Sequence, residues 1–508
     1  MQVTLISPPQ NFSKTQETAG VVPPLGLCYL AAVLDVDRYK VNIIDGVAQK
    51  YWQTYTWQEY GLRGMTFDEI LAAIPAETKV VGISNLYTFA FMVAAEIARR
   101  IKEEYPDKII VFGGAHPTIM TRQTMARPQV DFVVLSEGEN TFRDLLDAIE
   151  NGGGWEDIDG LAYRKDSEVV INPKTKFVKN LDEIPFPRRD LLTMDYYFEA
   201  REPHGSANRD RWTTMLATRG CPYGCTFCNT PQIWQRRWRC RSPENVVDEI
   251  VKLKEDYGVE EIHFEDESLT TKPDWVLDFG AELKRRNVDI IWQTSNGVRA
   301  ESINASTLDF MIESGCTQVT IAAESGSPRV LKEVIEKRLD LNAVKNAAKL
   351  ASKKPVFIAC YFMLGLPDEK ISDVFRSIFL AVRLAAYGVD EVVFSIFSPL
   401  PGSKLLIRLQ EEGKVHIGDQ FFDGLTPHGD LFVSKSYSDH ISDRQVVLLK
   451  YLGYLMFYLT KLVLHPFKVL HSVRNVLTGV QQIKTERALR TWLLRLLGKE
   501  HKRREGSS

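Results

Sequence analysis

Three cysteines crowded into one turn constrain this 508-residue chain more than any other feature. Cys221, Cys225 and Cys228 have the spacing C-x3-C-x2-C and follow a strand-like run at residues 213–218. Clustered thiolates indicate a metal site. Structural zinc sites close with four ligands, whereas the other cysteines of this chain are scattered singly. The motif therefore favours an iron–sulfur cluster with one iron open to a small molecule, and a zinc knuckle or a disulfide is the alternative.

The spacing resembles the signature of the radical S-adenosylmethionine (SAM) superfamily. This resemblance implies that Cys221, Cys225 and Cys228 bind a [4Fe–4S] cluster, and that the amino and carboxylate groups of SAM chelate the open iron. It also implies that one electron from the cluster cleaves SAM to a 5′-deoxyadenosyl radical. Phe227 lies between the last two cysteines and is expected to cover the cluster and the adenine ring.

The region that contains the cysteines alternates between strand-like and helical runs. Six such β/α units predict a partial (β/α)6 barrel of the TIM type, open on one side, with functional residues at the carboxyl ends of its strands. The cysteines follow the first strand, as a site at that end requires. We assign this radical SAM core domain to residues 206–430. Its strands are predicted at residues 213–218, 261–265, 290–294, 318–323, 356–363 and 391–397.

The other strand ends of this barrel carry polar residues that a purely structural barrel does not need. Three consecutive acidic residues end the second strand, where like charges are costly unless a cation or a donor meets them. A solvated acidic turn is the alternative, and for Glu324 the alternative is a helix N-cap partner. In the family, the corresponding elements bind the amino group, ribose, carboxylate and adenine of SAM. The resemblance implies such roles for Glu265, Asp266, Glu267, Asn296, Arg299, Glu324, Ser325, Gly365 and Leu366.

Residues 1–150 show a second β/α alternation with shorter units. It predicts a doubly wound, Rossmann-like parallel sheet. Sheets of this kind bind ligands beyond the carboxyl ends of their strands. The strands are predicted at residues 3–6, 41–45, 80–84, 109–112 and 132–135, and the helices at 25–34, 89–104 and 140–150.

Residues at these strand ends resemble the cobalamin-binding domain, whose pattern is DxHxxG, then SxL, then GG. The last two parts are present, but the histidine that ligates cobalt from below has no counterpart, as in cobalamin-binding radical SAM proteins. The alternative is a domain of this fold that has lost the cofactor, and for His116 it is an ordinary loop hydrogen bond. The resemblance implies cobalamin contacts by Ser84, Leu86, Gly113, Gly114, His116, Glu137, Gly138 and Glu139.

Two further segments complete the chain. Residues 151–205 are predicted to be a linker with a hairpin at 161–164 and 169–172. Residues 431–508 are predicted to be helical, with a break at His465 and Pro466. From residue 441 to the end there are 13 Lys/Arg and 4 Asp/Glu, a net charge of +9. Because the whole chain has a net charge of −3, the preceding residues carry a net charge of −12. This basic segment is typical of a membrane-interface helix or of a cap across the open barrel. One apolar helix face is predicted from Leu489, Trp492, Leu493, Leu496 and Leu497.

Cysteine usage and hydropathy indicate where in the cell the protein is located. Seven cysteines without a regular framework argue against a secreted disulfide scaffold. No uncharged apolar run approaches the roughly 20 residues that span a bilayer, and Met1 begins a strand-like run without a basic leader. The sequence predicts a cytoplasmic protein, membrane-associated if its C-terminal helices lie on lipid.

Together the resemblances imply an enzyme that uses a [4Fe–4S] cluster, SAM and cobalamin to methylate an unactivated carbon. The expected substrate is an apolar molecule or natural product, such as a lipid or isoprenoid-like compound. Radical cyclisation or rearrangement without methyl transfer is an alternative. A non-catalytic iron–sulfur protein is another, although it leaves Glu265, Asn296 and Glu324 unexplained. A reductant such as flavodoxin or ferredoxin is the expected partner, and no nucleic acid is expected because no RNA-binding module follows the barrel.

Overall fold

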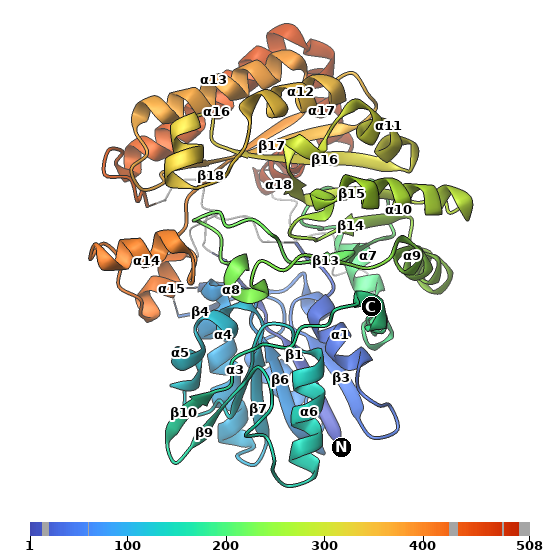
Figure 1. The fold of residues 1–508 in the computed structure, drawn as a ribbon, viewed down its shortest axis with the longest axis vertical. Coiled ribbons are helices and arrows are strands. Elements are labelled where there is room, and N and C mark those ends of the chain that lie inside the picture. Colours follow the sequence, from blue (N-terminus) through green and yellow to red (C-terminus); the bar gives the residue numbers. More distant parts are fainter. Residues whose placement is uncertain (13–19, 59, 426–434, 480–481, 497–508) are drawn as a thin grey trace.

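The computed structural model describes residues 1–12, 20–58, 60–425, 435–479 and 482–496. It contains two large sheets that face each other across the cysteine loop (Figure 1). The N-terminal sheet has the order β10-β9-β8-β7-β6-β1-β3, and its five strands β8, β7, β6, β1 and β3 are parallel. These five are β1 (Gln2–Ser7), β3 (Lys40–Asp45), β6 (Thr78–Ser84), β7 (Ile109–Gly113) and β8 (Phe132–Val134).

Helices cover both faces of this sheet, as a doubly wound fold requires. Strand alternation explains the arrangement: Ile110 and Phe112 pack on the α3 side, whereas Val111 points to the side of α1 and α6. The helices are α1 (Leu25–Ala32), α2 (Phe67–Ala72), α3 (Phe91–Glu104), α4 (Ala115–Ile119), α5 (Thr121–Met125) and α6 (Glu139–Glu150). The predicted Rossmann-like fold is confirmed.

Two features of this half differ from the sequence prediction. The hairpin β9 (Leu161–Lys165) and β10 (Glu168–Ile171), predicted within the linker, extends the N-terminal sheet because β9 pairs antiparallel with β8. A separate three-stranded sheet of β2 (Gln10–Phe12), β5 (Tyr60–Arg63) and β4 (Thr54–Trp57) was not predicted. Strands of three or four residues leave little periodicity in the sequence, and β2 pairs with a strand that is distant along the chain.

The second large sheet is the predicted partial barrel. Its six strands pair in parallel in the order β11-β14-β15-β16-β17-β18, and the edges β11 and β18 do not pair with each other. The strands are β11 (Trp212–Met215), β14 (Glu261–Phe264), β15 (Ile291–Val298), β16 (Cys316–Glu324), β17 (Phe357–Leu364) and β18 (Glu391–Ile396). The outer helices are α9 (Pro243–Tyr257), α10 (Pro273–Arg285), α11 (Ala305–Glu313), α12 (Leu341–Ala351), α13 (Ile371–Tyr387) and α14 (Lys404–Glu411).

The C-terminal segment is helical as predicted and packs on the barrel. Helix α16 (Asp443–Leu464) contacts α13 and β18, and it ends at His465, where Pro466 begins α17 (Pro466–Thr478). Helix α18 (Lys484–Leu496) lies beside edge strand β18, where Thr485 donates to Glu391 over 2.6 Å. Of the predicted apolar face, Leu497 lies outside the described residues, as do the side chains of Trp492 and Leu496.

Candidate active site between the two sheets

The cysteine loop lies between the two sheets (Figure 1). It connects the short strand β12 (Thr218–Arg219) with helix α8 (Thr230–Trp234), and α8 contacts α4 of the N-terminal domain. Thr226 anchors the loop, because its hydroxyl donates to Val334 O over 2.7 Å and its backbone N–H to Ile335 O over 3.0 Å. Gly220 precedes the loop with φ +84°, and a Cβ there would lie 2.0 Å from Arg237 O. The loop therefore has a fixed entry and a fixed centre.

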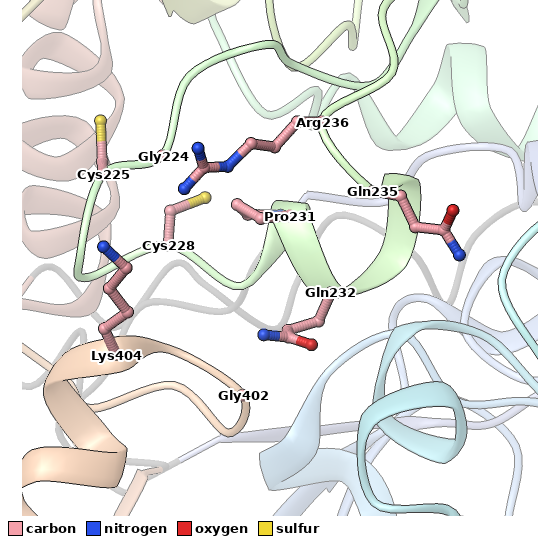
Figure 2. Close-up of a pocket in the computed structure, with 9 residues that line it drawn as sticks. All are labelled: Gly224, Cys225, Cys228, Pro231, Gln232, Gln235, Arg236, Gly402 and Lys404. Atoms are coloured by element: carbon pink, nitrogen blue, oxygen red, sulfur yellow. The ribbon is translucent and has the colours of Figure 1, made fainter.

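The three cysteines are free and half-buried. Burial raises the pKa of all three thiols, that of Cys225 to about 11. Cys225 and Cys228 line a cavity of about 330 Å³ together with Arg236 and Lys404. Figure 2 shows the Arg236 guanidinium over the loop, beside Gly224.

The donor set fits a cluster that is held by three thiolates. Cys221, Cys225 and Cys228 are close enough for the charge of one to affect the pKa of another. In the described part of the chain, no three acidic, histidine or cysteine side chains, the three cysteines included, are already gathered as metal ligands. The fit therefore rests on three thiols in one anchored loop beside a cavity.

The acidic run after β14 sends its three carboxylates in different directions. Glu265 Oε2 lies 3.0 Å from His204 Nδ1. Asp266 is buried and accepts hydrogen bonds from Thr218 Oγ1 (2.5 Å) and from the backbone at Ala217, and burial raises its pKa to about 7. Glu267 accepts from Gly220 N (3.1 Å) and Trp234 Nε1 (2.7 Å). Asp266 thus braces the strand before the cysteines, and Glu267 lies beside their loop.

The end of β16 provides an ion pair next to the loop. Glu324 has φ +61° and accepts from Lys337 Nζ over 3.0 Å. Both charges affect the thiol of Cys225, Lys337 in the lowering and Glu324 in the raising direction of its pKa. Ser325 is fully buried, and its hydroxyl accepts from Ser327 N, so its side chain faces the protein interior.

Arg299 and Tyr223 form one wall of a second cavity beside the cysteine loop. The Arg299 guanidinium lies 4.1 Å from the ring centroid of Tyr223, inside the cysteine motif, and Nη2 donates to Glu301 over 3.1 Å. Both residues line a cavity of about 170 Å³ with Ser268, Thr270 and Ser302. Asn296 is exposed on β15.

The Gly-Leu-Pro turn after β17 is held by a buried carboxylate. Glu369 Oε2 accepts from Gly365 N over 2.6 Å and from Leu366 N over 3.3 Å. Gly365 has φ +77°, a conformation that favours glycine. Leu366 belongs to an apolar cluster against which Phe227 packs, so the turn and the cysteine loop share one hydrophobic support.

The carboxyl edge of the N-terminal sheet is built from glycines and exposed apolar side chains. Gly114 has φ +113°, and a Cβ there would lie 2.7 Å from Asn85 O, whereas Gly113 has no neighbour closer than 3.9 Å. Leu86 is 57% exposed and Tyr87 50%. Ser84 is half-buried at the end of β6. This open apolar edge fits a large flat ligand such as cobalamin.

His116 is buried behind that open edge. Its ring is tilted against that of Phe91 at 4.4 Å and stands edge-on to that of Phe422 of α15 (Asp419–Leu425) at 5.3 Å, and Nδ1 lies 3.2 Å from Thr88 Oγ1. Burial lowers its pKa to about 3. A neutral imidazole therefore packs between the N-terminal domain and a barrel helix.

The Glu-Gly-Glu element forms ion pairs across the two domains. Arg219 Nη1 donates to Glu137 over 2.8 Å, and Arg219 Nη2 donates to Glu139 over 2.6 Å. Arg239 Nη1 also donates to Glu137, over 3.1 Å. All but Arg239 are buried. The structure thus directs both carboxylates to arginines that flank the cysteine loop, and Gly138 packs against Val134 and Leu30.

Sequence reasoning missed the cations of this site, Arg219, Arg236 and Lys337, and also Lys484 of α18, which donates to Tyr361 OH in the barrel. Arg219 lies two residues before Cys221 and Arg236 eight residues after Cys228, so proximity was a usable signal. Lys337 and Lys484 lie far away along the chain and carry no motif. Of the remaining cysteines, Cys316 and Cys360 are buried in the hydrophobic core of the barrel.

Comparison with known proteins defines the class. The model of the radical SAM superfamily matches residues 215–381, and that of the B12 binding domain matches residues 15–146. An uncharacterized methyltransferase of Pyrococcus horikoshii is 33% identical over 406 residues, 80% of this chain and 82% of that protein. Cytidylyl-2-hydroxyethylphosphonate methyltransferase of Streptomyces wedmorensis is 31% identical over 428 residues, 77% of this chain and 78% of that protein.

The fold agrees with this class. A solved structure of the cobalamin-dependent SAM radical enzyme OxsB, with aqua-cobalamin and SAM bound, superposes with a TM-score of 0.67 at 16% identity, covering 98% of this chain and 76% of that chain. The chain belongs to the radical SAM superfamily, among the enzymes that carry a B12 binding domain. This family includes methyltransferases.

Proposed function

We propose that this enzyme transfers a methyl group to an unactivated carbon of a small molecule. The observation that carries the proposal is the position of the cysteine loop between the carboxyl ends of the barrel strands and the open apolar edge of the N-terminal sheet (Figure 1). Both relatives named above are called methyltransferases. When bound, a [4Fe–4S] cluster supplies an electron to SAM, and cobalamin carries the methyl group.

In this proposal the barrel side chains hold the cluster and SAM. Cys221, Cys225 and Cys228 bind the cluster, and Glu267 and the Glu324–Lys337 pair provide charges beside it. Arg299 on Tyr223 faces the carboxylate of SAM, and the Gly365 turn supports the adenine. Asp266 acts indirectly, because it fixes the backbone before the loop.

The N-terminal sheet is proposed to hold cobalamin at Ser84, Leu86 and the Gly113–Gly114 pair. Exposed Leu86 and Tyr87 offer apolar contact, and the glycines allow a close approach of the backbone. Glu137, Glu139 and His116 are proposed as positioning residues, because their side chains pack between the domains.

Anaerobic reconstitution with iron, sulfide, cobalamin and SAM, followed by reduction, tests the function. We expect 5′-deoxyadenosine and S-adenosylhomocysteine together. Deoxyadenosine alone would favour cyclisation or rearrangement, and neither product would favour a non-catalytic iron–sulfur protein. Absence of cobalamin absorbance after reconstitution would contradict the assignment of the N-terminal domain. Flavodoxin and ferredoxin are the reductants to compare.

We further propose that the C-terminal helices contact an anionic membrane surface. Three packed helices, α13, α16 and α17, lie at the end of the molecule opposite the N-terminal sheet (Figure 1). Each presents an exposed apolar stripe with helical spacing that includes one arginine. The stripes are Phe375, Phe379 and Arg383; Arg444, Leu448, Leu455 and Leu459; and Phe467, Leu470, Arg474 and Leu477.

The charge of the three arginines favours an anionic membrane surface as the binding partner. Arg383, Arg444 and Arg474 have no acidic partner within 4.0 Å among the described residues, so their charges suit anionic headgroups. Helix α16 is long and apolar enough to span a membrane by composition, with 28% of its most apolar window buried. Because α16 packs on α13 and β18, the geometry favours contact with the surface rather than insertion.

Sedimentation with vesicles tests this contact without truncating helices that the barrel needs. We expect binding to phosphatidylglycerol-containing vesicles and at least a fivefold loss in Val463→Ser/Phe467→Ser, whose side chains are 76% and 84% exposed. Val36→Ser, at an apolar site on the N-terminal domain that is 67% exposed, is the control. Equal partitioning of all three proteins would contradict the proposal. A cytoplasmic location remains the sequence prediction.

A further inference from the structure

The inner face of the barrel borders accessible space near the carboxyl ends of its strands. Alternate residues of β16, β17 and β18 are partly exposed although their neighbours on the same strands are buried. Cross-strand register joins Ala322 to Tyr361 and Tyr361 to Val393, so these side chains share one face. Met363 and Ser395 continue the same face one step further. We call this space the barrel hollow.

The inner face of the barrel also carries polar side chains that are covered from solvent, in part by the segment at Gly205. Residues Gln293, Ser295 and Thr320 lie on the inner face and are at most 3% exposed. Each has a side-chain oxygen with no hydrogen-bond partner in the described structure. Buried polar atoms are rarely left unsatisfied without a reason such as an absent ligand or water.

Two charged groups face the hollow. Lys484, from α18, donates to Tyr361 OH over 2.9 Å and lies 5.2 Å above the Tyr361 ring. No described carboxylate lies within 4.0 Å of its ammonium group. Glu265 Oε1 is buried and has no hydrogen-bond partner among the described residues. Burial raises the pKa of this carboxyl, but the hydrogen bond with His204 and the charges of His204, His263 and Lys484 lower it overall.

The hollow lies on the side of the barrel that meets the N-terminal domain. The cysteine loop follows the first barrel strand at this end, and α8 at the end of the loop contacts α4. A molecule in the hollow thus lies between Lys484 and the edge that is proposed to hold cobalamin. Met363 and Val393 leave an apolar wall for its carbon skeleton.

We propose that the barrel hollow is the substrate site and that Lys484 binds an acidic group of the substrate, a carboxylate or a phosphonate. Among the described residues the ammonium of Lys484 bonds to a phenol and to no carboxylate, so it lacks the charge-assisted bond that an anion supplies. Glu265 Oε1 accepts a hydrogen bond from a hydroxyl or amine elsewhere in the same molecule. This assignment rests on the proposed function, and it narrows the expected apolar or natural-product substrate to one with an acidic group.

Ligand-observed saturation-transfer NMR on the reconstituted holoenzyme tests the site with four probes of similar size: propionate, ethylphosphonate, propylamine and 1-propanol. We expect saturation of propionate, ethylphosphonate or both, at least fivefold above the amine and the alcohol. The ratio of the two anions identifies the acidic group. Lys484→Met is expected to remove the anion signal at least fivefold, and Lys484→Arg to retain it.

Lys353→Met changes an exposed lysine that has no carboxylate within 4.0 Å among the described residues; it is the matched control and is expected to behave as wild type. Equal saturation by 1-propanol, or an anion signal that survives in Lys484→Met, would overturn the assignment. Substrate-free formation of 5′-deoxyadenosine in the same samples separates the two proposals. If wild type forms 5′-deoxyadenosine but the anion signal is the same in Lys484→Met, only the substrate assignment fails. If wild type forms none, the proposed function fails.

Discussion

The two edges that face each other across the cysteine loop are built on opposite principles. The barrel edge offers charged side chains, such as the Glu324–Lys337 pair and Arg299. The N-terminal edge offers bare backbone at Gly113 and Gly114 and exposed Leu86. A small charged ligand is recognised by side chains, whereas a wide flat one requires that side chains be absent. The contrast is what we expect of a site that brings SAM and cobalamin together.

The largest effect is expected from the barrel edge, at Cys225. Cys225→Ala removes one of the three proposed cluster ligands, so we expect loss of bound iron and a fall in SAM cleavage on the order of 1,000-fold, about 4 kcal/mol in activation free energy. Iron analysis and 5′-deoxyadenosine assay measure both. Cys240→Ala changes a half-buried cysteine outside the loop and should leave both unchanged. Full iron content in Cys225→Ala would refute the assigned ligand set.

The ion pairs of Arg219 with Glu137 and Glu139 form the joint between the two edges, and breaking this joint is expected to give the next largest effect. Arg219→Met leaves Glu139 buried without its arginine, and removing one partner of a buried pair costs about 3 kcal/mol or more. We expect a lower urea midpoint and reduced methyl transfer relative to SAM cleavage, because the edges lose their fixed spacing. Arg188→Met breaks the exposed pair with Asp190 and should cost less than about 1 kcal/mol. Equal midpoints for the two variants would show that the joint is not important for stability.

The N-terminal edge is tested alone by Gly114→Ala. Its φ of +113° and the 2.7 Å approach to Asn85 O make any Cβ strained, at a cost of about 1–3 kcal/mol. We expect weaker cobalamin absorbance after reconstitution and unchanged 5′-deoxyadenosine formation. Gly26→Ala, where a Cβ meets nothing within 4 Å, is the control. If Gly114→Ala lowers deoxyadenosine as much as cobalamin content, the edges do not act separately.

Sequence reasoning located the strands of both sheets because apolar runs of alternating β/α units are local features. It placed the cysteines, the acidic run and the Gly-Leu-Pro turn at strand ends, and these residues lie there. The sequence did not predict the direction of the side chains. Asp266 and Glu137 were predicted to contact cofactors, but Asp266 accepts hydrogen bonds from Ala217 and Thr218, and Glu137 accepts one from Arg219. Those partners are distant in sequence. Lys484 reaches the barrel only through the packing of α18, which no local pattern encodes.

The smallest effect concerns a residue behind the barrel edge. Burial raises the pKa of Glu369 to about 8, above its ordinary value of 4.5. Between these values the folded protein holds a proton that the unfolded chain loses, so the free energy of unfolding falls as pH rises from about 5 to 8. Glu369→Gln should remove this slope, on the order of 1 kcal/mol across the window after structural relaxation.

Asp368→Asn is the matched control for this pH dependence. Its pairing with Arg408 lowers the pKa of the Asp368 carboxyl, so its contribution to stability is constant between pH 5 and 8 and is lost only in acid. Urea unfolding of wild type and both variants at pH 5, 6.5 and 8 measures the slopes. A wild-type slope that persists in Glu369→Gln would place the titrating group elsewhere. In that case the Glu369 carboxylate that holds the turn at Gly365 would be ionised throughout this pH range. The barrel edge would then carry one more negative charge than we assign to it in the comparison with the N-terminal edge.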